Sequence, residues 1–221
     1  MQAILDRLEQ LYGAQTAPWP SDAYRFLVWW NCGYPASDAA CAKGWEALQK
    51  NVGIEPDQIL ATPAAKLSQI LKAGGLVPDV RAERLQQLAD RTLEEFDGDL
   101  TRELASLSLA KARALLKSFD GIADPGADRI LLFAGIAPVA AAPSNSPQVV
   151  VRIHVGEARG NYNQSYKQAL EIIEASVPAT VADRSRAYLL LKRHGEQLCK
   201  RSAPRCHNCP VAAGCKFHSF R

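Results

Sequence analysis

Four cysteines near the C-terminal end constrain this 221-residue chain more than any other feature of its sequence. They follow the spacing C-x6-C-x2-C-x5-C and are Cys199, Cys206, Cys209 and Cys215. Four thiolates that converge from one short segment can each bind one iron of a cubane cluster. The spacing therefore favours a [4Fe–4S] cluster held by these four side chains.

Three other roles for the cysteines compete with the cluster: zinc ligands, disulfides and inert buried residues, although inert buried cysteines rarely cluster so densely. Zinc also binds four cysteines, but usually as two C-x2-C pairs, and only Cys206 and Cys209 form such a pair. Disulfides need an oxidising compartment, and the N-terminal segment MQAILDRLEQLY lacks the apolar core of a secretory signal. The remaining two, Cys32 and Cys41, are expected to be small buried hydrophobic residues.

The charge of the chain is unevenly distributed. The net charge is only +3, but the segment 183–221 has nine Lys/Arg and two Asp/Glu, and the rest of the chain is mildly acidic. A basic end on an acidic body suggests an anionic partner, although a solvated tail would have the same composition. No run of 18 apolar residues is present, so we expect no membrane span and a cytoplasmic protein.

Apolar residues recur with a helical period along almost the whole chain, which predicts an all-α fold. One such stripe is formed by Ile4, Leu5, Leu8, Leu11 and Tyr12. The simplest role of these stripes is core packing.

Three local patterns add detail to this helical interpretation. Thr62 and Pro63 are typical of an N-cap and a first helical residue. The β-branched run 149–151 favours a strand locally, but an isolated strand would have no partner, so we predict a helix there. The segment 134–147, rich in Ala, Pro and Ser, is predicted to connect two helical parts.

The cysteine spacing resembles the iron–sulfur signature of endonuclease III and similar adenine glycosylases. The preceding segment 191–199, LKRHGEQLC, is similar to the Leu-x-x-His-Gly-x-x-x-Cys of that family. The segment 81–85 resembles the helix before the family's hairpin, and the segment 120–135 takes the place of the hairpin and its following helix.

The resemblance implies two helical domains with a DNA-binding cleft between them. One domain, 21–134, would be a helical bundle with a helix-hairpin-helix, and the other, 1–20 together with 135–221, would carry the cluster. The implied partner is damaged double-stranded DNA, bound by a monomer. The implied chemistry is removal of a damaged base after the base has been flipped out of the duplex.

The hairpin departs from the family pattern Leu-Pro-Gly-Val-Gly-Arg-Lys. Gly121 matches the first glycine and Ala123 stands at the second, where backbone N–H groups would approach a DNA phosphate. Asp124 follows, and Pro125 occupies the position of the family's nucleophilic lysine. Proline cannot form a Schiff base, and the Asp124 carboxylate would repel a phosphate. Asp124 is also suited to be an N-cap, with Pro125 as the first helical residue.

The catalytic aspartate of the family also has no counterpart. Counting back from Arg152 places Pro143 at that position. Ser144 or Asn145 could orient a water molecule, but neither can stabilise a cationic sugar as a carboxylate does. Three carboxylates near the hairpin could substitute, Asp120, Asp124 and Asp128. Asp124 and Asp128 are four residues apart and would share a helical face. Capping or solvation is the simpler role for all three.

Two further positions are candidates for DNA contact. Tyr34 lies near the family's gap-filling glutamine and could wedge into a duplex, or could be a packed core tyrosine. The cations Lys200, Arg201 and Arg205 lie between the first two cysteines, where the cluster would hold them in a rigid loop. Such a loop suits phosphate contact.

The sequence therefore leaves three hypotheses. The first is a DNA repair protein that excises a damaged base without a lysine-based lyase step. The second is a binder of damaged DNA without catalytic activity. The third abandons the resemblance and describes a zinc-stapled helical protein that docks another protein.

Overall fold

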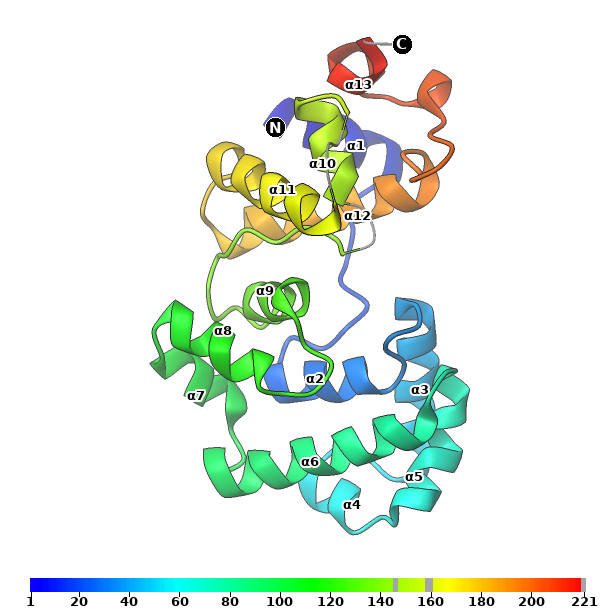
Figure 1. Ribbon diagram of the computed structural model, residues 1–221, viewed down its shortest axis with the longest axis vertical. Coiled ribbons are helices and arrows are strands. Elements are labelled where there is room, and N and C mark those ends of the chain that lie inside the picture. Colours follow the sequence, from blue (N-terminus) through cyan, green and yellow to red (C-terminus); the bar gives the residue numbers. More distant parts are fainter. Residues whose placement is uncertain (145–146, 158–160, 220–221) are drawn as a thin grey trace. The chain divides into compact units, whose positions relative to one another are not determined.

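The structure is a computed structural model that describes residues 1–144, 147–157 and 161–219. Throughout these residues the regular secondary structure is helical, without a strand, which confirms the predicted all-α class. The chain forms two compact units, one of residues 18–136 and one of residues 1–17 with 137–221. Figure 1 shows the helices of both units. In the described ranges no helix has the length and apolar character needed to cross a membrane.

The unit 18–136 contains most of the helices. They are α2 (Ala23–Asn31), α3 (Asp38–Asn51), α4 (Pro56–Leu60), α5 (Ala64–Leu71), η1 (Lys72–Gly74), α6 (Pro78–Phe96), α7 (Leu100–Ser106), α8 (Leu109–Lys117) and α9 (Asp124–Phe133). The longest helix, α6, packs against α2, α4 and α5 (Figure 1). The side chains of Asp22, Ser37 and Asp99 cap α2, α3 and α7 by accepting a backbone N–H.

An arginine lies among aromatic rings in the core of this unit. The guanidinium carbon of Arg129 lies 3.8 Å from the ring centroid of Trp19. Its Nη2 also donates to Asp38 Oδ1 at 3.1 Å. A buried charge is tolerated when it is paired and stacked in this way. The contacts join α9, which follows the hairpin, to α3 and to the segment before α2.

A second buried arginine fixes the loop before α6. Arg81 donates from Nε to Leu76 O at 2.8 Å and from Nη2 to Gly75 O at 2.9 Å. Nη2 also donates to Leu71 O at 2.8 Å, and Nη1 donates to Cys32 O at the end of α2. These bonds hold the loop 71–77 against the end of α2.

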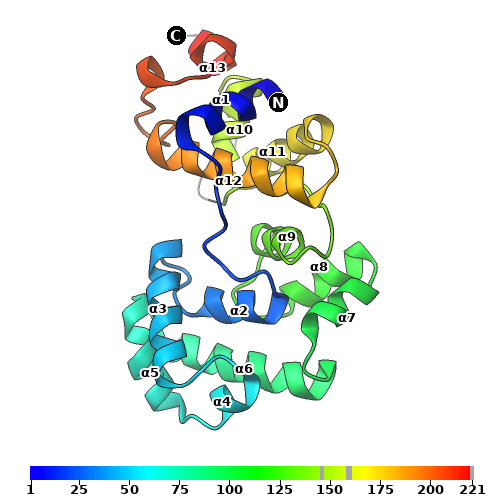
Figure 2. The ribbon, with the colours of Figure 1, turned by 180° about the vertical axis from the view of Figure 1, so that it is seen from behind.

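The unit built from residues 1–17 and 137–221 joins the two ends of the chain. Its elements are α1 (Gln2–Tyr12), α10 (Pro147–His154), α11 (Tyr162–Ser176), α12 (Val181–Gln197), η2 (Cys206–Asn208), η3 (Ala212–Gly214) and α13 (Lys216–Ser219). Helix α1 packs along α12, as the view from behind in Figure 2 shows. Leu5 and Leu8 of α1 belong to the same core as Leu190 and Leu191 of α12.

The valine run adopts the predicted helix rather than a strand. Val149, Val150 and Val151 all lie in α10 and are completely buried. A helix buried on all sides can be apolar all round. Burial therefore overrides the local β preference of these residues. Residues 134–144 of the predicted connection contain no helix, whereas its last residue, Pro147, already belongs to α10.

Four local predictions are wrong in detail. Leu11 is half exposed and does not join the core stripe of α1. Helix α5 begins at Ala64 with Pro63 as its N-cap, and the Thr62 hydroxyl donates back to Gln58 O at 2.9 Å. Thr62 therefore does not cap α5, and its hydroxyl instead satisfies a carbonyl in the last turn of α4. Helix α9 begins at Asp124, so Asp124 and Pro125 each lie one position later than expected.

Candidate metal centre and nucleic-acid interface

The four C-terminal cysteines all line one pocket in the unit that contains α12. Apolar side chains complete its wall, among them Ile153, Leu198 and Val211. Cys215 is buried, and the other three cysteines are partly exposed. The two leftover cysteines, Cys32 and Cys41, are buried in the other unit, as predicted. The fold thus brings the four predicted ligands, and not the other two, to one place.

Polar groups approach three of the four sulfurs, and one of these contacts is the bond that Cys215 Sγ donates to Arg152 O at 3.5 Å. Nη1 of Arg152 lies 3.7 Å from Cys199 Sγ, and Nε2 of His194 lies 3.6 Å from Cys209 Sγ. Burial raises the pKa of both thiols, and Arg152 opposes this for Cys199. Thiols in such surroundings ionise readily only when a cation binds them.

His194 is held in place by the N-terminal helix. The hydroxyl of Tyr12 lies 3.0 Å from His194 Nδ1. Burial lowers the pKa of His194 to about 4 and raises the pKa of Tyr12 to about 12. The imidazole is therefore neutral and the phenol protonated near pH 7. In the tautomer that carries its proton on Nε2, the Tyr12 hydroxyl donates to Nδ1 and Nε2–H faces Cys209 Sγ.

No set of three or more His, Cys, Asp or Glu side chains in the described part of the chain is arranged to hold a metal ion. The donor chemistry nevertheless fits an anionic iron–sulfur group. All four cysteines face one pocket, its lining includes no carboxylate, and Arg152 adds a positive charge beside it. In a cubane each thiolate would bind a different iron, so the four ligands of such a group need not meet at one ion.

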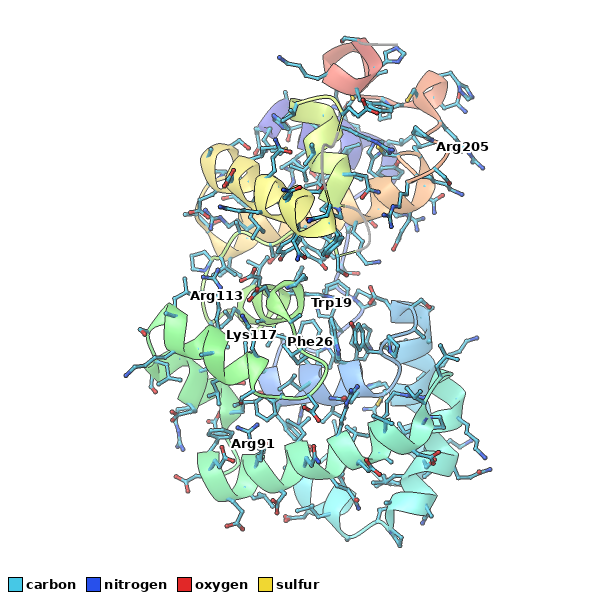
Figure 3. All side chains as sticks on the ribbon, viewed as in Figure 1. Trp19, Phe26, Arg91, Arg113, Lys117 and Arg205 are labelled. Carbon is cyan, nitrogen blue, oxygen red and sulfur yellow. The ribbon has the colours of Figure 1, made fainter. Side chains whose placement is uncertain are left out.

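The loop between the first two cysteines presents its three cations to solvent. Lys200, Arg201 and Arg205 are all exposed, and Figure 3 labels Arg205 on this loop. Arg152 donates from Nη1 to Lys200 O and from Nη2 to Arg201 O, each at 2.8 Å. Two bonds from one rigid guanidinium fix the backbone of the loop. No pattern in the sequence indicated this role of Arg152.

The predicted hairpin turn lies between α8 and α9. Gly121 is exposed and has a φ of +83°, which glycine adopts without strain. Ala123 is the N-cap of α9, and Asp124 is exposed in the first turn. Asp124 Oδ1 lies 2.7 Å from the ammonium nitrogen of Lys117 on α8, which Figure 3 labels. Lys117 therefore offsets the charge that was expected to repel a phosphate.

Asp128 differs from its expected role as a cap or a solvated residue. It is 2% exposed, and its Oδ1 accepts a hydrogen bond from Nε of Arg113 at 2.7 Å. A buried carboxylate needs such a partner. The pair joins α8 to α9 on both sides of the hairpin.

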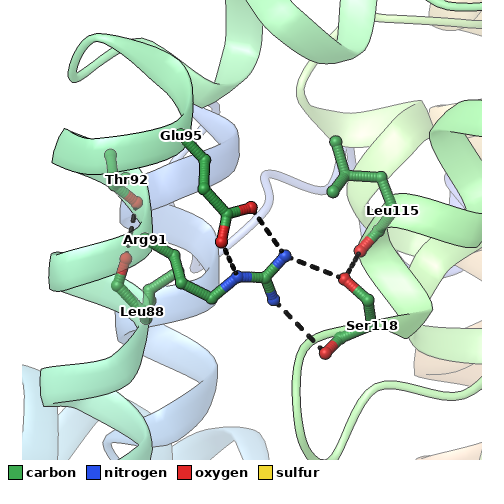
Figure 4. A network of polar contacts seen from close by, with 6 residues as sticks. All are labelled: Leu88, Arg91, Thr92, Glu95, Leu115 and Ser118. Atoms are coloured by element: carbon green, nitrogen blue, oxygen red, sulfur yellow. Dashed lines mark hydrogen bonds and ion pairs between the residues drawn. The ribbon is translucent and has the colours of Figure 1, made fainter.

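A third contact ties the hairpin to α6. Arg91 on α6 donates to Ser118 O at 3.3 Å and to Ser118 Oγ at 3.1 Å, as Figure 4 shows. Its guanidinium also pairs with Glu95 at 2.9 Å and lies 4.2 Å from the ring centroid of Phe119. The charge of Arg91 is thus compensated within the fold.

Tyr34 is neither fully buried nor free. About a third of its surface is exposed, and its ring stacks on Trp30 at 4.7 Å between centroids. Leu76 and Val77 are also exposed, on the loop that Arg81 holds. The sequence predictions included neither residue, and their place between a glycine pair and a proline in the run GGLVPD was the only available signal.

The segment predicted to replace the catalytic aspartate is only partly described. Pro143 is buried and Ser144 is partly buried. Asn145 lies outside the described residues. No carboxylate occurs in this described part of the segment.

Comparison with known proteins supports the helical architecture. No model of a protein family matches the chain. A protein of Methanocaldococcus jannaschii named "Putative DNA repair glycosylase" is 24% identical over 164 residues, which are 73% of this chain and 71% of that protein. A trapped endonuclease III–DNA covalent intermediate matches with a TM-score of 0.77 and 18% identity, over 100% of this chain and 96% of that one.

A second solved structure gives the same result. A thermostable thymine-DNA glycosylase matches with a TM-score of 0.78 and 19% identity, over 100% of this chain and 97% of that one. These similarities extend over the whole chain and include both units. The chain therefore has the helical fold of endonuclease III.

Proposed function

We propose that this protein binds damaged duplex DNA as a monomer and excises a damaged base by hydrolysis. The observation that carries the proposal is the structured turn at Gly121, braced by α6, α8 and α9, within an endonuclease III fold. The relative named as a DNA repair glycosylase supports the same activity.

A lysine-dependent lyase step is not part of the proposal. Pro125 has no nucleophile, and Lys117, the lysine beside it, is engaged with Asp124. The enzyme would therefore be monofunctional, with water as the nucleophile. Asp128 is paired with Arg113, which leaves Asp124 as the more accessible carboxylate at the hairpin.

We also propose that Cys199, Cys206, Cys209 and Cys215 hold a [4Fe–4S] cluster. When bound, such a group would stiffen the loop that carries Lys200. The test is iron and acid-labile sulfide content with near-visible absorbance after anaerobic purification. About four irons per chain would support the proposal, and one zinc in a colourless protein would favour the zinc-stapled alternative.

DNA contact would come from two surfaces. The exposed cations Lys200, Arg201 and Arg205 suit the backbone, and the exposed Tyr34 with Leu76 suits insertion into the base stack. Replacing the three cations by alanine should lower the slope of log K against log salt by about 2–3 units. An unchanged slope would contradict the backbone contact.

One experiment separates the remaining possibilities. Duplexes with alkylated, oxidised or deaminated bases are incubated with excess protein, with and without borohydride. Base release without a trapped covalent adduct is the expected result. A trapped adduct would reveal a lyase that uses another amine. Binding without release from any duplex would support the alternative of a damaged-DNA binder, which the loss of both family catalytic residues favours.

A further inference from the structure

We infer that Arg84 on α6 contacts a backbone phosphate of DNA beside the turn at Gly121. This inference rests on the proposed function and adds a contact to the same hairpin. A Cβ atom built on Gly121 would lie 3.0 Å from Nη1 of Arg84. The guanidinium therefore packs directly against the glycine, which is exposed.

Arg84 and Arg91 lie on the same face of α6 but differ in whether another residue compensates their charge. They are seven residues apart, about two helical turns, so both project towards the hairpin. Arg91 pairs with Glu95 and holds Ser118, which Figure 4 shows. The charge and the N–H donors of Arg91 are thus satisfied by contacts within the fold.

Arg84 has no such compensation. Among the described residues it makes neither an ion pair nor a hydrogen bond, and its Nε is buried without a partner. It lines a cavity of about 210 Å³ together with Asp90 and Asp120, but neither carboxylate lies within ion-pair distance of it. A partly buried cation with unsatisfied donors is costly unless a ligand completes it.

The chemistry of the turn identifies the ligand. The hairpin has lost one backbone donor at Pro125, and the Asp124 carboxylate lies in the first turn of α9. A guanidinium beside Gly121 supplies charge-assisted N–H donors at that place. Planar guanidinium donors match a phosphate, so the occupant is a phosphate of the DNA backbone.

The test compares three variants of the full-length chain by fluorescence anisotropy on a duplex with a tetrahydrofuran abasic site, at increasing KCl. Arg84→Gln and Arg84→Met remove the charge, and Met keeps the aliphatic packing. Both should lower the salt slope by about one unit and weaken binding at low salt about tenfold. Arg84→Lys should keep the slope of the wild type.

The matched control is Arg102→Gln. Arg102 is also a helical arginine, but it lies on α7, is exposed and pairs with Asp97. The control variant should leave the slope unchanged. Circular dichroism melting identifies any variant that does not fold. A wild-type slope in Arg84→Met would overturn the inference, as would a loss in Arg84→Lys equal to that in Arg84→Gln. If the wild type binds no DNA, the proposed function fails. If the wild type binds DNA and Arg84→Met keeps its slope, only the inference about Arg84 fails.

Discussion

The hydroxyl of Tyr12 and Nδ1 of His194 lie 3.0 Å apart, although 182 residues separate them in the chain. Their contact joins α1 to α12 and places the other imidazole nitrogen at Cys209. The two ends of the chain are thus linked at the wall of the cysteine pocket.

Removal of this hydroxyl should destabilise the unit that contains α1 and α12. Tyr12→Phe leaves the buried His194 Nδ1 without its hydrogen-bond partner, which should cost about 1–2 kcal/mol of unfolding free energy. Urea denaturation followed by circular dichroism measures the change. Leu11→Ala, on the exposed side of the same helix, is the control and should change stability by less than about 0.5 kcal/mol. Equal effects of the two substitutions would refute the role of the bond.

Acid should destabilise the protein in part through His154. Burial, with a smaller contribution from the N-terminal charge, lowers the pKa of His154. The native state therefore favours the neutral imidazole, whereas the unfolded chain takes up a proton below a pH of about 6.5. This stability is present above that pH and is lost as the pH falls. His154→Asn should show a smaller decrease in unfolding free energy between pH 7.5 and pH 5. An identical decrease in both proteins would exclude this contribution.

Alanine substitutions at Gly121 and Gly135 distinguish the cost of backbone strain from the effect of displacing a side chain. Both have positive φ, but a Cβ at Gly135 meets no atom within 4 Å, whereas one at Gly121 meets Arg84. Each alanine substitution should cost about 1–2 kcal/mol from the backbone. Only Gly121→Ala should also weaken binding to duplex DNA, because it displaces the guanidinium. Anisotropy titration measures this, and equal affinity of the two variants would argue against the contact.

The two ion pairs at the hairpin should differ in strength. Arg113→Ala removes the guanidinium that pairs with the buried Asp128 carboxylate and should cost about 3 kcal/mol. Lys117→Ala breaks a pair exposed on both sides and should cost less than about 1 kcal/mol. Guanidinium denaturation of both variants gives the comparison. If Lys117→Ala cost more unfolding free energy than Arg113→Ala, burial would not determine the strength of these ion pairs.

Arg152 should protect the cationic loop from proteolysis. Arg152→Lys cannot make the two separate bonds to Lys200 O and Arg201 O, so the loop should open more often. Trypsin cleavage after residues 200, 201 and 205 should become several-fold faster, as mass spectrometry would detect. Arg186→Lys, which replaces a surface ion-paired arginine of α12, is the control. If trypsin cleaved both variants at the wild-type rate, the two hydrogen bonds from Arg152 would not be what holds the loop.

The sequence by itself determined the helical class and the four cysteines that share a pocket. Apolar spacing along a helix and the order of cysteines in one segment are local properties, so residues such as Leu5 and Cys209 could be interpreted directly. Even the valine run 149–151 was predicted correctly, because no partner strand was present.

Only the tertiary structure decided which charges are free and which are used. Asp128 is buried against Arg113, Asp124 meets Lys117, and Arg84 remains uncompensated beside Gly121. These relations join separate helices, and no periodicity in the sequence encodes them. The energy of an ion depends on its burial and its partners, and both are set when the helices pack together.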